Sequence, residues 1–292
     1  MIETCEKQIE TWSKTLVFTT FFALIFFQMC GVSYALSEEG KPALYLVSVG
    51  VGDPDLITVR AINTIKVSDV IVCREKTKER FVKYLKGKEF LDISLSGWRT
   101  YGRDCSRIKD KEKRITCEQN RGKRAKLISG IRSAIAAGKT VAVLGSGDLL
   151  IYGGPYRWYL KEFADVNPRV IPGVSCFNAA NAALRKDVAS GKETRAVVLT
   201  TIREIEKLSK HHPTMVIFTM HTKFKDLVEK LQNLYPLQTP IAVVVYAGYK
   251  EKERLIKGRL NTILEQVGDE KFPFEHLVYV GDFLEQKRKK ER

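Results

Sequence analysis

The sequence has few residues of the kinds that bind metal ions. Its 292 residues include four histidines and six cysteines, with no Cys-x-x-Cys pair and no His/Cys cluster among them. Structural zinc sites need such ligands at short, regular spacing. The histidines are instead scattered over the second half of the chain, at His211, His212, His221 and His276. The sequence therefore predicts no metal centre.

Acidic residues are scarce relative to basic ones. The chain has 49 Lys and Arg against 34 Asp and Glu, a net charge of +15. Such an excess predicts attraction to nucleic acid, anionic lipid or a polycarboxylate ligand. Much of it lies in segment 97–126 and in the C-terminal tail, where neither zinc-finger spacing nor interleaved aromatic residues occur. Both absences argue against a nucleic-acid partner.

Two common nucleotide-binding fingerprints are also missing. Residues 43–49 predict a nearly continuous apolar strand, which ends in the turn Gly50-Val51-Gly52-Asp53-Pro54. This turn is not a GxGxxG motif, and no Gly-Lys-Ser/Thr follows it as in a P-loop. The sequence thus lacks the usual dinucleotide and P-loop signatures here.

A long uncharged run occurs only near the N-terminus, at residues 16–32. It is slightly shorter than the roughly 20 residues of a membrane-spanning helix. Ser33-Tyr34-Ala35 follows, with small residues at the −3 and −1 positions of a cleavage site after Ala35. We interpret residues 1–40 as a signal peptide or a membrane anchor, which predicts an exported (periplasmic) or membrane-anchored protein. If Met29 is the true start, the protein is cytoplasmic.

The cysteines leave the compartment open. Cys105 and Cys117 lie within the basic segment, and in an exported protein they would form a disulfide that closes a loop of it. In a reducing cytosol they would be free thiols. Cys73 and Cys176 lie in apolar contexts and are expected to be small core residues.

From residue 43 onward, short β-rich runs alternate with helical stretches, which predicts an α/β fold. We expect an N-terminal α/β domain at 41–185, a C-terminal α/β domain at 186–285 and a basic tail at 286–292. Within the first domain, the polar stretch at about 96–121 is expected to be a surface insertion, followed by a helix at 124–137. In the second domain, adjacent strands at 241–246 and 253–257 predict a hairpin and hence a mixed sheet.

Three turns each follow an apolar strand and precede a helical stretch. They are residues 50–54, Gly145-Ser146-Gly147-Asp148 and Pro172-Gly173-Val174-Ser175. Ligands of parallel α/β sheets bind at the carboxyl ends of the strands, and glycines allow close approach of the backbone. The three turns are therefore expected to line one edge of one sheet, where they suit an adenine, ribose or amino-acid moiety.

These motifs occur in a recognisable order. LYLVSVGVGDPDLITVRAINTIKVSDVIV resembles the opening of the tetrapyrrole methylases, GSGDLLIYG resembles their second loop, and VIPGVS resembles their third turn. The second loop and the second half of the chain are most similar to the precorrin-4 and cobalt-precorrin-4 C11-methyltransferase branch. The resemblance implies a class III methyltransferase-like fold of two α/β domains, a cleft for S-adenosylmethionine (SAM) between them, and a homodimer.

Transferred residue by residue, the resemblance implies a set of SAM contacts from both halves of the chain, with either Ala247 or Gly248 supplying the last of them. The set comprises Val51, Ser146, Gly147, Asp148, Ile151, Ser175, Cys176, Met220, Ala247 and Gly248. Family substrates carry many carboxylates, for which Arg99, Arg103 and Arg107 in the insertion are candidate ligands.

The chain departs from the family pattern at three positions. Val51 and Leu149 stand where many members have proline. Arg74 stands where uroporphyrinogen-type members have an aspartate that is proposed as a base, so uroporphyrinogen methylation is not transferred. The next residue, Glu75, is a candidate proton acceptor, and a surface salt bridge to Arg74 or Lys76 is its alternative role.

The leading hypothesis is a SAM-dependent C-methyltransferase that acts on a tetrapyrrole or corrinoid precursor in cobalamin-type biosynthesis. A second hypothesis is a diphthine synthase-like or ribosomal-RNA-type methyltransferase. A third is an exported or anchored tetrapyrrole-binding protein with little or no catalysis, which the N-terminal segment, Val51, Leu149 and the enlarged insertion motivate.

Overall fold

The computed structural model describes residues 43–91, 95–154, 156–192 and 195–285. The predicted leader, with its apolar run at 16–32, and the basic tail at 286–292 lie outside the described residues. All described residues belong to a single compact unit. Among them, no helix combines the length and the apolar character that a membrane span requires.

The first sheet is wholly parallel, as expected for apolar strands that alternate with helices. Its five strands have the order β3-β2-β4-β1-β5. In chain order they are β1 (Leu44–Ser48), β2 (Val70–Val72), β3 (Glu89–Phe90), β4 (Val141–Gly145) and β5 (Arg169–Ile171). β1 lies between the central strand β4 and the edge strand β5 and pairs with both.

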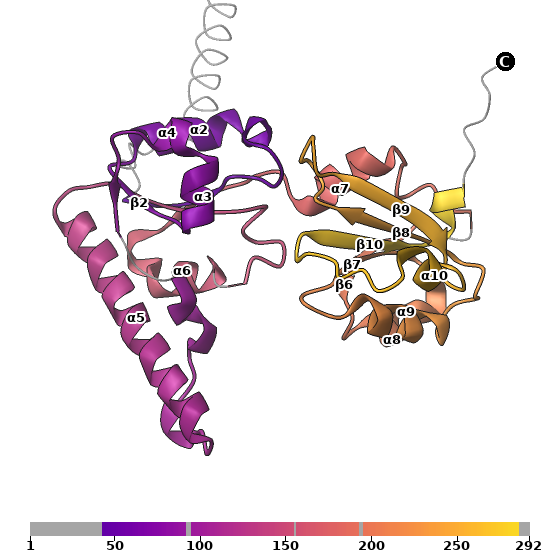
Figure 1. The fold of residues 1–292 in the computed structure, drawn as a ribbon. Coiled ribbons are helices and arrows are strands. Elements are labelled where there is room, and N and C mark those ends of the chain that lie inside the picture. Colours follow the sequence, from indigo (N-terminus) through magenta and orange to yellow (C-terminus); the bar gives the residue numbers. More distant parts are fainter. Residues whose placement is uncertain (1–42, 92–94, 155, 193–194, 286–292) are drawn as a thin grey trace, which may run out of the picture. The chain divides into compact units, whose positions relative to one another are not determined.

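Helices bury both faces of this sheet. Leu44 and Leu46 point to one face and Tyr45 and Val47 to the other, because successive side chains of a strand alternate. The first face packs against α5 (Lys111–Ala136) and α6 (Tyr156–Glu162), and the second against α2 (Val59–Val67) and α4 (Val82–Leu85) (Figure 1). The short helix α3 (Glu75–Arg80) follows β2 directly.

Much of the expected surface insertion is helical. The 3-10 helices η2 (Leu95–Thr100) and η3 (Cys105–Arg107) precede α5, which begins at Lys111. The prediction that this helix begins at Arg124 is therefore wrong. The first half of α5 buries only Cys117 and Asn120, so it lacks the apolar periodicity that marks a helix in a sequence. Asp110 caps the helix by accepting a hydrogen bond from the Lys113 N–H at 2.9 Å.

Cys105 and Cys117 form a disulfide that ties η3 to α5. Both cysteines are buried. Of the two states that the sequence left open for this pair, the structure therefore has the bonded one.

The second sheet is mixed, with the strand order β6-β7-β10-β8-β9. Its strands are β6 (Val197–Thr201), β7 (Thr214–Phe218), β8 (Pro240–Val245), β9 (Arg254–Arg259) and β10 (His276–Val280). β6 and β7 are parallel, whereas β7–β10, β10–β8 and β8–β9 are antiparallel. The predicted β8–β9 hairpin and the predicted mixed sheet are confirmed.

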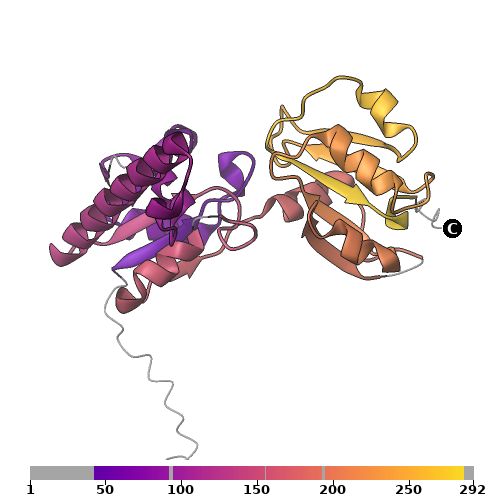
Figure 2. The same ribbon diagram turned by 90° about the horizontal axis from the view of Figure 1, so that it is seen from below.

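Each face of the second sheet has its own helical cover. α7 (Cys176–Leu184) packs on one face, whereas α8 (Ile205–Leu208), α9 (Phe224–Gln232) and α10 (Ile263–Val267) pack on the other. Figure 2 shows the orange helix α9 lying across the strands. Because α7 follows β5 of the first sheet, the turn before α7 joins an edge of the first sheet to the covering of the second.

Candidate functional site

The three turns predicted to share an edge are joined by backbone hydrogen bonds. The Gly147 N–H donates to the carbonyl of Gly50 at 3.0 Å, and the Val51 N–H donates to the carbonyl of Val174 at 3.1 Å. This contact follows from the parallel pairing of β1 with β4 and β5, which brings their carboxyl ends to one edge. The expectation that these turns lie together is confirmed.

The turn after β4 places Ser146, Gly147 and Asp148 at this edge. Gly147 has φ +74°, a conformation that is unfavourable for residues with a Cβ atom. The hydroxyl of Ser146 lies 3.4 Å from the carbonyl of Gly50. Asp148 accepts a hydrogen bond from the Leu150 N–H at 2.9 Å, so its carboxylate is held in place beside the turn.

Residues at the ends of β7 and β8 and the start of β10 complete a pocket of about 350 Å³. This volume falls within the range of about 300–1,000 Å³ that is typical of small-molecule sites. Tyr152, Met220 and Tyr246 have positive φ angles of 52°, 49° and 53°. Such conformations cost on the order of 1–3 kcal/mol each and cluster at ligand sites. Two of these residues, Tyr152 and Met220, line the pocket.

Most of the residues predicted to contact a cofactor line this pocket. They are Val51, Ser146, Gly147, Asp148, Ile151, Ser175, Cys176, Met220 and Ala247. They come from the turns after β1, β4, β5, β7 and β8. The structure thus brings together residues that span nearly two hundred positions of the sequence.

Of the two alternatives in the turn after β8, Ala247 faces the pocket and Gly248 does not. The carbonyl of Gly248 accepts a hydrogen bond from the Asp53 N–H at 2.9 Å, and its N–H donates to Glu253 at 2.8 Å. Gly248 therefore joins the turn after β8 to the turn after β1.

Four predicted charged residues are not part of the pocket lining. Glu75 is exposed and forms a surface salt bridge of 3.8 Å, but with Lys78 and not with Arg74 or Lys76 as expected, because residues three apart face each other on a helix whereas adjacent residues do not. Arg107 forms an ion pair with Asp104 at 3.1 Å, and both side chains are exposed to solvent. Arg99 and Arg103 are also exposed. The basic segment places its charges along η2, η3 and α5 and not around the pocket.

The pocket has a different cationic wall, formed by Arg74, Lys76 and Arg80. Arg80 donates to the carbonyl of Gly50 at 2.7 Å, to the Tyr249 hydroxyl at 3.1 Å and to the Ser146 hydroxyl at 3.3 Å. In the sequence these residues belong to the run Arg74–Arg80, which has the composition of a solvated helix. In the sequence Arg74 departs from the family pattern, and Arg80 carries no signal that marks it as a pocket residue.

An apolar wall comes from the second sheet. Phe218, Met220 and Phe274 line it. The ring of Tyr152 stands 4.5 Å from that of Phe218, and its hydroxyl donates to the carbonyl of Leu199 at 3.1 Å. Tyr152 thus connects the loop after β4 to strands β6 and β7. The pocket combines a polar, cationic side with an apolar, aromatic side.

Three titratable groups in the lining are shifted toward their neutral forms, and one of them is Tyr152, whose pKa is raised by burial. Burial raises the pKa of the Cys176 thiol to about 11. Burial also lowers the pKa of His276, whose Nδ1 lies 2.5 Å from the carbonyl of Pro273. No group of His, Cys, Asp and Glu side chains with the makings of a metal site occurs among the described residues. The pocket has the groups to bind an organic molecule by backbone, cationic and aromatic contacts.

A parallel sheet and a mixed sheet whose strand ends share one pocket define a two-part α/β binding protein or enzyme. The sequence model of the tetrapyrrole (corrin/porphyrin) methylases matches residues 43–264. The chain therefore belongs to the tetrapyrrole methylase family.

Curated relatives match nearly the whole chain. A cobalt-precorrin-4 C(11)-methyltransferase of Methanocaldococcus jannaschii is 28% identical over 265 residues, covering 85% of this chain and 91% of the relative. A precorrin-4 C(11)-methyltransferase of Rhodococcus erythropolis is 28% identical over 252 residues, covering 82% and 91%. The similarity extends over both sheets.

Solved structures share the fold. A cobalt-precorrin-4 methyltransferase from cobalamin biosynthesis matches with a TM-score of 0.62 at 21% identity, covering 83% of this chain and 96% of the other. A uroporphyrin-III C-methyltransferase of Thermus thermophilus, complexed with S-adenyl homocysteine, matches with a TM-score of 0.58 at 18% identity, covering 83% and 93%. The predicted two-part α/β fold is confirmed.

Proposed function

We propose that this protein is a SAM-dependent C-methyltransferase that acts on a tetrapyrrole or corrinoid precursor of the cobalamin type. The observation that carries the proposal is the convergence of nine predicted cofactor-contact residues on one pocket. The names of the relatives, which are precorrin-4 and cobalt-precorrin-4 C(11)-methyltransferases, support this substrate class.

The pocket residues fit SAM in size and chemistry. The pocket volume of about 350 Å³ suits a nucleoside-sized molecule. The backbone of Ser146–Asp148 offers polar groups to the ribose and amino-acid parts, whereas Ile151 and Met220 offer apolar surface to the base. When bound, SAM supplies an activated methyl group on its sulfonium. The chain's own task is to align the two reactants, which in a methyl transfer supplies much of the rate enhancement.

Calorimetric titration of the full chain with SAM and S-adenosylhomocysteine (SAH) tests the cofactor claim, and we expect saturable 1:1 binding. Incubation with precorrin-4 or cobalt-precorrin-4 and methyl-labelled SAM then tests the reaction, with transfer of label to the macrocycle as the expected result. Absence of SAM and SAH binding would contradict the proposal. Binding without label transfer would favour the second candidate below.

The disulfide favours a second candidate function, an exported or membrane-anchored tetrapyrrole-binding protein with little or no catalysis. Disulfides persist in oxidising compartments and are rare in the cytosol, and Cys105–Cys117 is such a bond. N-terminal sequencing of the protein from its host tests the location. A start near Leu36 supports export, whereas a start at Met29 supports a cytoplasmic enzyme.

We also propose that the functional unit is a homodimer, as the family resemblance implies. Sedimentation equilibrium of the full chain tests this proposal, with a mass of twice 33.2 kDa expected if the leader is retained. We do not extend the proposal to RNA or protein substrates, because the relatives above are named for precorrin substrates.

A further inference from the structure

The cationic wall of the pocket contains two side chains whose charges are not paired with a carboxylate of the described chain. Arg74 and Lys76 both line the pocket and are exposed. Within the described residues, neither side chain has a hydrogen-bond or ion-pair partner. Glu75, which lies between them in the sequence, pairs with Lys78 instead.

Many other exposed basic residues of the described chain are neutralised by a nearby carboxylate. Arg107, Arg132, Lys139 and Arg254 each form an ion pair. In the pocket itself, Arg80 directs its guanidinium to three oxygens of the protein. Arg74 and Lys76 are therefore the cations of this wall that remain available to a bound molecule.

The opposite wall restricts the kind of molecule. Phe218, Met220 and Phe274 line the pocket from the second sheet. Phe274 is 59% exposed, so its apolar surface is open to a second ligand beside the cofactor. A ligand that satisfies both walls has a flat apolar body and negatively charged substituents.

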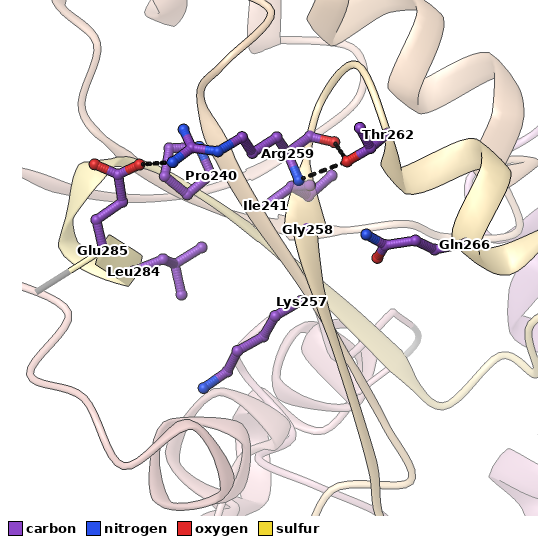
Figure 3. Close-up of a pocket in the computed structure, with 9 residues that line it drawn as sticks. All are labelled: Pro240, Ile241, Lys257, Gly258, Arg259, Thr262, Gln266, Leu284 and Glu285. Carbon is purple, nitrogen blue, oxygen red and sulfur yellow. Dashed lines mark hydrogen bonds and ion pairs between the residues drawn. The ribbon is translucent and has the colours of Figure 1, made fainter. Parts of the chain in front are cut away.

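A second pocket of the structure offers no comparable arrangement of free cations beside an aromatic wall. It lies beside the edge strand β9, and Figure 3 shows Arg259 directed toward Glu285, an ion pair of 2.6 Å. Arg259 also donates to the carbonyl of Gln238 at 2.5 Å. One of its two cations is thus already neutralised by the protein, and its lining contains no aromatic side chain.

We propose that Arg74 and Lys76 form a carboxylate-binding subsite that selects a macrocycle by its acidic side chains. This inference rests on the proposed function, because it assigns a role in substrate recognition to residues of the same pocket. Arg74 accepts a carboxylate through two parallel N–H donors, whereas Lys76 acts as a point charge. Neither residue is among the cofactor contacts that the family resemblance implies.

The test is a fluorescence titration of the full chain with uroporphyrin III, an octacarboxylate, in the presence and absence of SAH. Arg74→Ala and Lys76→Ala should each weaken porphyrin binding about three- to tenfold, as for charged contacts at a partly exposed site. The double variant should lose at least about tenfold, and Arg74→Lys should lose less than Arg74→Ala because it keeps the charge. Affinity for SAH should stay within about twofold in every variant.

Arg60→Ala is the matched control. Arg60 is an exposed arginine on α2 that does not line the pocket, and its replacement lowers the net charge by the same amount. Equal losses for Arg74→Ala and Arg60→Ala would overturn the subsite, because they would reflect overall charge alone. No binding of uroporphyrin III to the unaltered chain would overturn it as well.

The two proposals fail in distinguishable ways. If the Arg74 and Lys76 variants lose porphyrin affinity but the chain binds no SAH, the carboxylate subsite is supported and the methyltransferase proposal is contradicted. If the chain binds SAH but the Arg74 and Lys76 variants leave porphyrin affinity unchanged, the subsite is contradicted and the cofactor proposal stands. In an active enzyme, Arg74→Ala should raise KM for the macrocycle while kcat with bound substrate changes little.

Discussion

The carbonyl oxygen of Gly248 occupies the space that a side chain on Gly52 would need. A Cβ atom built on Gly52 would lie 2.3 Å from that oxygen, and the adjacent Asp53 N–H donates to it at 2.9 Å. The turns after β1 and β8 are therefore in direct backbone contact. Because both turns belong to the site, this contact sets the position of Val51 and Ala247 in the pocket lining.

Gly52→Ala should destabilise the protein and weaken SAH binding. Its φ of +71° already disfavours alanine, by about 1–2 kcal/mol, and the Cβ atom also meets backbone that cannot turn aside. We expect a loss of more than about 3 kcal/mol in the free energy of unfolding, measured by urea denaturation. Gly87→Ala is the control, because Gly87 has φ +76° with nothing within 4 Å of its Cβ position. Similar losses in both variants would contradict the steric explanation.

Arg80→Lys should weaken SAH binding although it keeps the positive charge. The guanidinium contacts Gly50, Ser146 and Tyr249 together, and a lysine ammonium cannot reproduce this fork. We expect a loss of about tenfold in affinity by calorimetry, the equivalent of one or two charged hydrogen bonds. Tyr249→Phe removes a single contact and should lose less. An Arg80→Lys variant that binds SAH as well as the unaltered chain would show that this network does not shape the pocket.

Replacing Cys105 and Cys117 together with serine should lower stability under oxidising conditions. The bond joins residues 12 positions apart, and a loop of this size corresponds to about 2–3 kcal/mol of stabilisation in the chain-entropy account. The unaltered chain treated with dithiothreitol should show the same loss by urea denaturation, and the double variant should not respond to the reductant. Peptide mass spectrometry should find the 105–117 link in the untreated protein, and failure to find it would contradict the prediction.

Alkylation by iodoacetamide should distinguish the two half-buried free cysteines of the described chain. Burial raises the pKa of both Cys73 and Cys176 to about 11, so both thiols should react slowly near neutral pH and faster as the pH approaches that value. Cys176 lines the pocket and Cys73 does not. SAH should therefore protect Cys176 and leave Cys73 unchanged, as measured by mass spectrometry of the modified peptides. Equal protection of both would contradict the assignment of the pocket.

The same shifts predict a loss of stability in alkali. Each thiol has a folded-state pKa above its ordinary value of 9.0, so the folded state retains protons that the unfolded state has lost. The contribution to stability is complete below pH 9.0 and disappears as the pH rises toward about 11. Cys176→Ala should flatten this part of the pH profile of the urea midpoint. An unchanged profile would show that the thiol does not control it.

The sequence was sufficient to predict the turns after β1, β4 and β5, because parallel strands carry their carboxyl ends to one edge and glycine is needed where the backbone reverses. Residues 43–49 could be assigned as a buried strand from their continuous apolar character alone. Helix α5 could not be placed in full, because its first half buries only Cys117 and Asn120 and so leaves no periodic signal.

Charged residues show most clearly what only the tertiary structure decided. Arg99 and Arg74 look alike in the sequence, since a lysine- and arginine-rich run predicts solvent exposure and says nothing about which neighbour it faces. The pairing order β2-β4-β1 places the end of β2 beside the three turns, and Arg74 follows β2 directly. Arg74 therefore lines the pocket and Arg99 does not, because local sequence sets the element in which a side chain lies, whereas long-range strand pairing sets what that side chain can reach.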